Sequence, residues 1–185
     1  MLIETSRLVL RRFRAADAAC LAAYRSDPEV ARHQSWTAPV SLEAAQELAR
    51  TFAHGSPDQP GWFQYAIELK TDGRLVGDAG VRLHDNIMQA ELGITLDSKE
   101  QGHGYATEAV HAILTDLFET RGLHRVSADC DARNARSAAL LQRVGFVLEG
   151  RRRAGTWIKE EWTDDLLFGL LASEWHHARV SSPHS

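Results

Sequence analysis

Gln101-Gly102-His103-Gly104-Tyr105-Ala106 stands between a predicted strand that ends at Leu96 and a strongly periodic helix. Glycines at a strand-to-helix turn let several backbone N–H groups converge, and the dipole of the following helix adds partial positive charge. Such a turn suits a pyrophosphate group. A tight turn without a ligand is the alternative reading, and for an isolated pair of glycines it is the commoner one.

This glycine turn differs from two familiar phosphate-binding loops. It lacks the Gly-Lys-Ser/Thr ending of a nucleoside-triphosphate loop. It also comes late in the chain, after a predicted antiparallel meander, whereas a dinucleotide-binding loop follows the first strand of its fold. Both differences disfavour a nucleotide-binding enzyme.

Hydrophobic periodicity on either side of the turn predicts a mixed sheet flanked by helices, in the α/β (α+β) fold class. The strand–helix–strand step from Ala90 to Cys130 lies inside an otherwise hairpin-linked sheet, and it requires a parallel pair of strands. The predicted strands are residues 8–10, 62–69, 75–83, 90–96, 125–130, 146–153 and 162–171, and the predicted helices are residues 17–27, 41–55, 106–121 and 138–145.

The length of 185 residues fits one domain. We expect this domain to span residues 5–175 and the tail, residues 176–185, to be disordered, because the chain ends in Ser-Ser-Pro-His-Ser. Hydrophobic residues make up 44% and charged residues 25%, the balance of a globular protein. The formal charge of −4, from 21 basic and 25 acidic side chains, gives no basic footprint for nucleic acid.

Cysteine and histidine usage bears on location and on metal binding. Cys20 and Cys130 lie far apart and neither belongs to a Cys-x-x-Cys pair, so we expect free thiols. Residues 1–14 lack the apolar core of an export signal, and no stretch reaches the length of a membrane span. We therefore expect a cytoplasmic protein without membrane contact. The nine histidines are scattered, with no His-Glu-x-x-His motif, so we expect no metal site.

Several segments together resemble the GNAT superfamily of N-acetyltransferases. The turn reads Gln101-x-x-Gly104-x-Ala106 followed by Thr-Glu-Ala, and it looks like that family's acetyl-CoA pyrophosphate loop. Further along the chain, DARNARS at 131–137 and GF at 145–146 resemble the family's second cofactor segment. The opening ETSRLVLR at 4–11 is similar to the start of the RimJ/RimL-like branch, which acetylates protein N-termini and assorted small amines. Their joint occurrence, in order, is far more specific than the glycine turn alone.

The resemblance implies a GNAT fold in which two parallel strands, residues 90–96 and 125–130, splay apart around a cofactor. The pantetheine arm of acetyl-CoA, the expected co-substrate, would bond to the backbone of the first strand. Asn134 would face the pantetheine or the thioester, and the N-cap of the following helix is an alternative role compatible with the first. The implied cofactor contacts are Ile94, Thr95 and Leu96 on the strand and Gln101, Gly102, His103, Gly104, Tyr105, Ala106 and Thr107 on the turn.

Two residues are candidates for proton transfer, which the reaction needs because the acceptor amine must be neutral and the departing thiolate takes a proton. Glu91 occupies a place where similar enzymes carry a carboxylate, so it is the candidate base; an ion-pair partner for an arginine is the alternative role. Many relatives use a tyrosine as the acid, but none follows Tyr105 here. Ser137 matches a serine of the RimJ/RimL-like branch and is the candidate acid, or else an ordinary residue of the first helical turn.

The acceptor side of the site is less specific in the sequence. His33 and Trp36 lie in the loop between the first two helices, which borders the acceptor pocket in this family. His84 precedes the central strand, and Trp157 flanks the last hairpin on the same side. Aromatic side chains there would suit a peptide or a hydrophobic amine, although a tryptophan is more often part of a core.

We therefore predict an N-acetyltransferase that moves an acetyl group from acetyl-CoA to a primary amine, on a protein N-terminus or a small molecule, by direct transfer in a ternary complex. No covalent enzyme intermediate is expected, because no Cys or Ser lies in a triad-like setting. A homodimer is an alternative to a monomer. A GNAT module that binds acyl-CoA as a sensor or scaffold, without turnover, is the alternative function.

Overall fold

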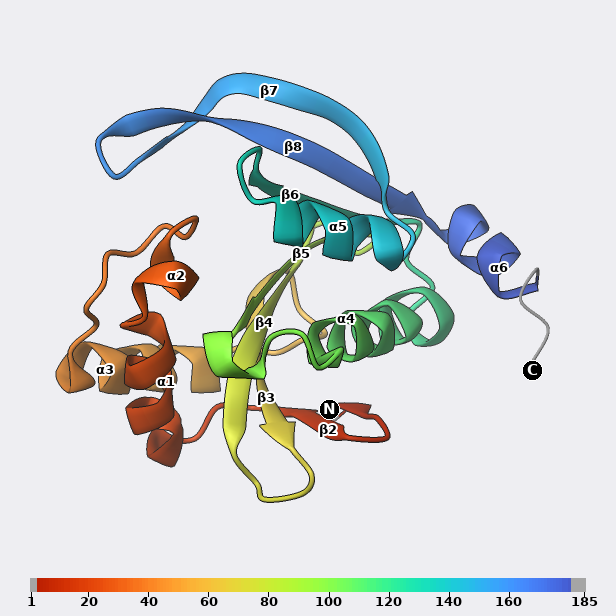
Figure 1. Cartoon of the computed structure of the whole chain (residues 1–185). Helices are drawn as coiled ribbons and strands as arrows, with labels where there is room; N and C mark the ends of the chain where they lie inside the picture. Colours follow the sequence, from red (N-terminus) through yellow and green to blue (C-terminus); the bar gives the residue numbers. More distant parts are fainter. Residues whose placement is uncertain (1–2, 181–185) are drawn as a thin grey trace.

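The computed structural model describes residues 3–180, and Figure 1 shows how its elements are arranged. The strands are β1 (Ile3–Glu4), β2 (Leu8–Arg11), β3 (Gly61–Leu69), β4 (Leu75–Leu83), β5 (Gln89–Leu96), β6 (Arg125–Asp131), β7 (Val147–Ile158) and β8 (Glu161–Leu171). The α-helices are α1 (Ala18–Arg25), α2 (Pro28–Ala31), α3 (Leu42–Ala53), α4 (Tyr105–Thr115), α5 (Ala135–Arg143) and α6 (Ala172–Val180). Short 3-10 turns, Ala15–Asp17 and Ser98–Glu100, precede α1 and α4, and a π-helical turn, Asp116–Thr120, extends α4.

The strands form one sheet in the order β1-β2-β3-β4-β5-β6-β8-β7. Every neighbouring pair is antiparallel except β5 and β6, which are parallel and are joined through α4. The predicted mixed sheet of the α/β class is therefore confirmed. Side chains of a strand alternate between its two faces, and on one face of β3 the buried residues are Phe63, Tyr65, Ile67 and Leu69, while Ala66 is buried on the other.

The two parallel strands pair over only three positions. Gln89, Ala90 and Glu91 of β5 lie opposite Arg125, Val126 and Ser127 of β6, and the pairing stops there. Beyond this point β5 continues on β4 as far as Leu96, and β6 continues on β8 as far as Asp131. The sheet thus opens between β5 and β6, as the predicted splay of the parallel strands requires.

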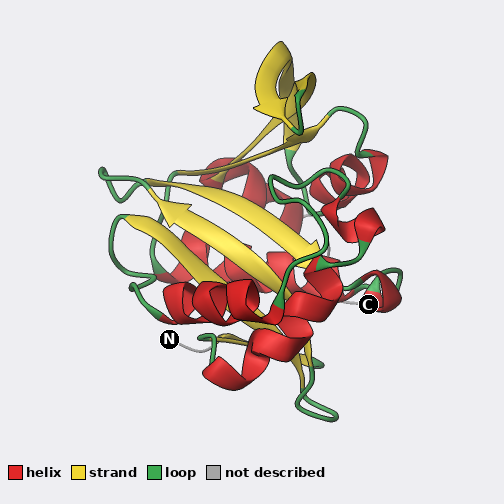
Figure 2. Ribbon diagram, turned by 90° about the vertical axis from the view of Figure 1, so that its left-hand side faces the viewer, coloured by secondary structure: helices red, strands yellow, loops and turns green. Residues whose placement is uncertain are grey.

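Helices cover both faces of the sheet, and each face has its own apolar cluster. Figure 1 places α1, α2 and α3 on one side of the strands and α4 on the other, and Figure 2 shows helices in front of and behind the sheet. The larger cluster packs α4 and α5, through residues such as Val110 and Leu140, against the sheet. The smaller cluster packs α1 and α3, through residues such as Leu21 and Ala49, against Ala66 of β3.

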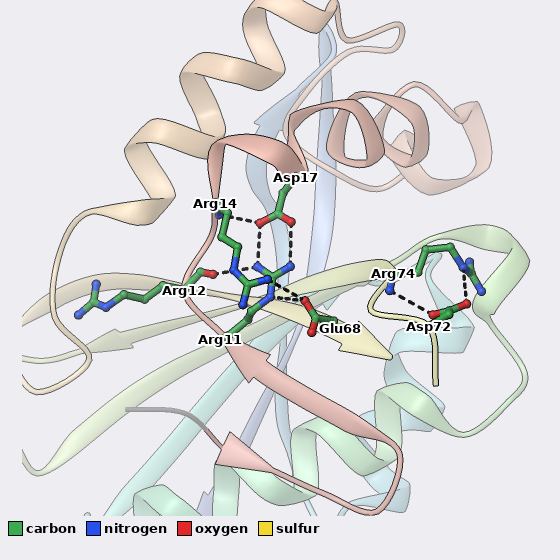
Figure 3. Close-up of polar contacts among 7 residues, drawn as sticks. All are labelled: Arg11, Arg12, Arg14, Asp17, Glu68, Asp72 and Arg74. Atoms are coloured by element: carbon green, nitrogen blue, oxygen red, sulfur yellow. Dashed lines mark hydrogen bonds and ion pairs between the residues drawn. The ribbon is translucent and has the colours of Figure 1, made fainter. Parts of the chain in front are cut away.

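A buried ion-pair network fixes the position of the turn that precedes α1. The Arg11 guanidinium donates to both carboxylate oxygens of Asp17 at 2.8 Å and to Glu68 Oε2 at 2.5 Å, which joins β2 to the turn before α1 and to β3 (Figure 3). The backbone N–H of Arg14 also donates to Asp17, at 2.7 Å. Burial opposes the charge on Arg11, but the hydrogen bonds from its two carboxylate partners outweigh it and raise the pKa of this guanidinium.

The last hairpin differs from the predicted one in its length. β7 continues to Ile158, and a two-residue turn at Lys159 and Glu160 joins it to β8. Both turn residues have positive φ, 50° and 65°, the geometry of the primed turns that suit a hairpin's twist. Lys-Glu is not a turn signal in the sequence, which explains why the prediction ended this strand early. Figure 2 shows the hairpin projecting from the rest of the molecule.

The C-terminal prediction was wrong in part, because α6 carries the chain past Trp175 to Val180. Trp175 is buried and its ring packs 4.8 Å from His111 and 5.8 Å from Phe118, which holds the start of this helix against α4. Residues 181–185, the rest of the predicted disordered tail, lie outside the described residues. Strand β1 and the short helix α2 were also not predicted; Asp27 caps α2 by accepting from Glu29 N at 2.9 Å.

Cys20 and Cys130 are free thiols, as predicted. Within residues 3–180, no helix has the length and apolar character needed to cross a membrane.

Candidate active site

The glycine turn positions the N-terminus of α4 at the open end of the sheet, where β5 and β6 are no longer paired. Gly102 and Gly104 have φ values of 82° and 81°, a left-handed conformation that L side chains rarely adopt. Gly104 is the N-cap of α4 and offers no side-chain cap to the first N–H groups of the helix. These backbone donors, with the positive end of the helix dipole, therefore remain available to an anion.

The carboxylate of Glu108, in the first turn of α4, binds residues at the start of the chain. Glu108 accepts from the hydroxyls of Thr5 and Ser6 at 2.5 and 3.0 Å, and from Arg7 N and Nε at 2.9 and 2.6 Å. Burial alone would raise the pKa of Glu108, but these donors outweigh it and lower the pKa to about 2. The opening segment, known from the sequence only as a resemblance, thus has a structural role at the turn.

Arg7 also contacts the glycine turn directly. Its guanidinium donates to His103 O at 3.0 Å and lies 4.7 Å from the centre of the Tyr105 ring. His103 and Tyr105 stack on each other at 5.7 Å. Two predicted cofactor contacts are therefore held by a residue near the start of the chain.

Gln101 connects the turn to β5 and to α5. Its amide donates to Leu96 O at 3.2 Å, and its Oε1 accepts from the guanidinium of Arg136 at 3.2 Å. Arg136 is exposed in the first turn of α5 and is an additional candidate for contact with a phosphate. Arg136 was not among the predicted contacts, although an arginine two residues after the N-cap Asn134 was a usable signal.

The free edge of β5 contains the predicted pantetheine contacts. Ile94, Thr95 and Leu96 pair with β4 but have no strand partner on the β6 side. Gly93, on the same edge, would carry a Cβ with no heavy atom within 4 Å. Because side chains alternate, this open space lies on the face of β5 that carries Glu91.

Asn134 and Ser137 lie at the start of α5, beside the open end of β6. Asn134 is the N-cap, and its Oδ1 accepts from Ser137 N at 3.1 Å, so the capping role foreseen for it is confirmed. The Ser137 side chain lies near the thiol of Cys130 on β6. Burial raises the pKa of that thiol, and the Ser137 hydroxyl partly opposes the rise. Ser137 is therefore beside the strand that borders the gap on one side.

Glu91 is the last residue of β5 that has a partner on β6. Its Oε1 lies 3.1 Å from the guanidinium of Arg82 and 3.1 Å from His84 Nε2, and 35% of its side chain is exposed. The arginine partner that formed the alternative role is therefore present, and the partly exposed carboxylate still borders the gap. His84, predicted as an acceptor contact, lies against Glu91.

A second carboxylate, Asp129, faces the gap from β6. It stands two residues after Ser127, the partner of Glu91, and therefore on the same face of the sheet. Loss of hydration raises the pKa of Asp129, and the negative charges of Asp165 and Glu91 add to the effect, while Arg152 opposes it. No sequence motif singles out Asp129, because only the register of β6 on β5 places it on the same face as Glu91.

The end of α2 and the loop after it contact the last hairpin and the end of β6. Lys159 Nζ donates to Ala31 O at 2.6 Å, and His33 Nδ1 lies 3.5 Å from a carboxylate oxygen of Asp131 at the end of β6. The pKa of Asp131 is lowered to about 2, chiefly by Arg133 and further by His33. His33 therefore lies beside the open end of the sheet, and its contact with an acceptor stays a prediction.

The two predicted tryptophans have different environments. Trp157 is 58% exposed at the hairpin tip and forms an edge-to-face pair with Trp162, with ring centres 5.3 Å apart. Trp36 instead covers the Arg25 guanidinium at 4.1 Å, donates to Arg25 O at 3.0 Å and packs on the smaller apolar cluster. These contacts give Trp36 a packing role in the helical layer.

Among the described residues, no group of three or more His, Cys, Asp or Glu side chains could hold a metal ion.

Comparisons with known proteins agree with this geometry. Residues 7–147 match the acetyltransferase (GNAT) domain family. An uncharacterized N-acetyltransferase of Bacillus licheniformis, p20, is 29% identical over 94% of this chain and 97% of its own. The [ribosomal protein uS5]-alanine N-acetyltransferase of Escherichia coli (strain K12) is 27% identical over 96% of this chain and 94% of its own.

A solved structure shows the same fold. The crystal structure of a GNAT-family acetyltransferase from Bacillus anthracis superposes with a TM-score of 0.85, covering 94% of this chain and 99% of that one at 24% identity. The glycine turn, the splayed parallel strands and the family match lead to one assignment. The chain belongs to the GNAT family of acetyltransferases and is an acetyltransferase enzyme.

Proposed function

We propose that this acetyltransferase transfers the acetyl group of acetyl-CoA directly to the primary amine of a peptide or protein N-terminus, within a ternary complex. One observation carries the proposal: the β5–β6 pairing stops at Glu91, so the gap has a carboxylate at its closed end. The uncapped N-terminus of α4 stands at the other end. A donor thioester held along this gap would lie beside a group that can take a proton.

The residues of the gap fit acetyl-CoA. The α4 N-terminus offers backbone N–H groups and positive dipole charge to a pyrophosphate, and Arg136 adds a guanidinium beside it. The unpaired edge of β5 from Leu92 to Leu96 offers backbone donors and acceptors to the amides of a pantetheine arm. At Gly93 the absence of a side chain leaves the space that an acetyl group and an amine would share.

The proposed reaction needs no covalent enzyme intermediate. An acceptor ammonium first loses a proton to Glu91, directly or through water, and becomes a neutral amine. The amine then attacks the thioester carbonyl carbon; a C–N bond forms, the C–S bond breaks, and the thiolate leaves with the nitrogen's second proton. Ser137, in the first turn of α5, would donate a hydrogen bond to sulfur as its negative charge develops.

A peptide N-terminus is the acceptor that the observations favour. An α-amino group has an ordinary pKa of about 7.7–8.0, so it needs less help from a carboxylate than a lysine-type amine with a pKa of about 10.4. The exposed Trp157 and Trp162 pair offers apolar and aromatic surface to residues that follow the terminal amine. The relative named for alanine acetylation of ribosomal protein uS5 supports the same class.

The proposal is tested by an acceptor screen that reads thiol release and confirms acetylated products by mass. Short peptides with free N-termini, the same peptides blocked at the N-terminus, polyamines and aminoglycosides form the panel. We expect turnover with free peptides and none with blocked ones. Turnover with polyamines or aminoglycosides alone would make the acceptor a small molecule. Binding of acetyl-CoA without CoA release for any member would favour the non-catalytic sensor or scaffold.

A further inference from the structure

Two side chains lie close to the same carboxylate oxygen of Glu91. One is Arg82 on β4, and the other is His84, the residue that follows this strand. Arg82 lies opposite Glu91 in the antiparallel β4–β5 pair and donates to Oε1 at 3.1 Å. His84 stands two residues after Arg82, on the same face, and its Nε2 lies 3.1 Å from the same oxygen. Within the described part of the chain, no hydrogen bond reaches the second oxygen, Oε2.

The His84 ring is held in this position by its surroundings. The backbone N–H of His84 donates to Gln89 O at 2.9 Å, which continues the β4–β5 ladder by one step and fixes the residue opposite β5. The Nε2 atom is buried and makes no hydrogen bond within the described structure, and it lies 3.1 Å from the Glu91 carboxylate, at ion-pair distance.

We propose that His84 is a positioning residue for Glu91: together with Arg82 it holds Oε1, so that Oε2 points to the acceptor amine. This inference rests on the proposed function, in which Glu91 takes the amine proton. It replaces the acceptor contact that the sequence suggested for His84. In other catalytic units a third side chain likewise orients the group that transfers the proton.

Several other charged groups face the Glu91 carboxylate or lie near it. They are Asp85 in the same loop, Asp129 on β6, Arg152 on β7 and Asp165 on β8.

The first test measures the contact without any turnover, by comparing the NMR signals of the His84 ring in the wild type and in Glu91→Gln at one pH. We expect the His84 ring signals to move, because the carboxylate 3.1 Å from Nε2 is lost. The His54 signal, from the exposed end of α3, is the internal control and should stay in place. Unchanged His84 signals would overturn the pairing, whatever reaction the protein catalyses.

The second test uses turnover with a peptide acceptor. We expect His84→Ala to lower kcat about tenfold, to leave the Kd for acetyl-CoA unchanged and to shift the pH–rate profile. His84→Gln, whose amide can still donate to Oε1, should recover part of kcat but not the original profile. His54→Gln is the matched control and should behave as wild type.

The outcomes of the second test separate the two proposals. A higher KM for the peptide with unchanged kcat and an unchanged pH profile would make His84 an acceptor contact and overturn the inference. Absence of CoA release from the wild-type protein across the acceptor panel would overturn the proposed function, while the NMR comparison of wild type and Glu91→Gln still decides whether His84 and Glu91 form a pair.

Discussion

Arg7 and Glu108 form the contact that joins the start of the chain to the glycine turn. The backbone N–H of Arg7 and its guanidinium both donate to the Glu108 carboxylate, and the closest ion-pair distance is 2.6 Å. The same guanidinium reaches His103 O, within the glycine turn. The conformation of the turn therefore depends on a residue far from it in sequence.

We predict that this contact makes stability depend on acidic pH. The pKa of Glu108 is lowered in the folded protein from an ordinary value of 4.5 to about 2. The stabilisation is complete above pH 4.5 and is lost as the pH falls through about 2, because the unfolded chain takes up the proton first. In urea unfolding, Glu108→Gln should be less stable than wild type at pH 6, and the difference should shrink toward pH 2. Glu43→Gln, on the exposed surface of α3, is the control; equal pH dependence of wild type and Glu108→Gln would contradict the prediction.

Replacement of Gly104 by valine should weaken acetyl-CoA binding at least tenfold. The residue has a φ of 81°, and a Cβ there would lie 3.4 Å from the Arg7 guanidinium and beside the donors of α4. Calorimetry measures the Kd. Gly122→Val is the matched control, since Gly122 also has a positive φ, 67°, but stands at the far end of the helical segment. The control should lose stability and keep its Kd; an unchanged Kd for Gly104→Val would remove the turn from the binding site.

Replacement of Glu91 by glutamine should lower turnover roughly a hundredfold near neutral pH, within the usual range of general acid–base catalysis. The loss should shrink at high pH, where more of the acceptor amine is neutral without help. A pH–rate profile with a peptide acceptor measures both effects. A variant whose profile keeps the shape and height of the wild type would show that Glu91 only pairs with Arg82 and His84.

Removal of the Ser137 hydroxyl separates a catalytic role from a structural one. The N-cap bond of α5 uses the backbone N–H of Ser137, so Ser137→Ala leaves that bond intact. We expect kcat to fall more than acetyl-CoA affinity, because a hydrogen bond to sulfur strengthens as charge develops on it. Asn134→Ala, which removes the cap itself, should instead cost about 1 kcal/mol of stability. A Ser137→Ala variant that loses only cofactor affinity would make the serine a binding contact.

A side chain at Gly93 should obstruct the reaction without unfolding the protein. No heavy atom lies within 4 Å of the position a Cβ would take, and β-branched residues suit a strand. We expect Gly93→Val to keep the melting temperature of the wild type and to raise the KM for the acceptor. Gly77→Val is the contrasting variant, because a Cβ at Gly77 would lie 2.2 Å from Thr95 O and should destabilise the sheet. Normal acceptor kinetics for Gly93→Val would place the amine elsewhere.

The fold was predictable because its signals are local. Alternation of apolar residues in strands and their helical spacing in α4 depend only on neighbours along the chain. The same holds for the Asn134 cap and for the glycine turn, whose conformation glycine itself permits. Missed elements had weak local signals, as at Lys159 and Glu160, or were very short, as in α2.

In the candidate site, only the local geometry of the glycine turn and of the start of α5 was predictable from the sequence. The glycine turn and Asn134 belong to short segments that can be recognised on their own. The partners of Glu91 could not be found in this way, because Arg82 and His84 reach it through the register of β4 on β5. Trp36 is the opposite case: its sequence position suggests the acceptor side, but the Arg25 guanidinium beneath it and the apolar cluster give it a packing role.

The sequence alone determined the α/β class, the order of the main strands and helices, the glycine turn and the family resemblance. Each of these depends on contiguous residues or on their spacing. Tertiary structure alone decided that the β5–β6 pairing stops at Glu91, that Asp129 faces the same gap, and that Arg7 and Glu108 hold the turn. These relations join residues far apart in the chain, and a one-residue change of strand register would turn each strand side chain to the other face. Only the folded sheet fixes that register.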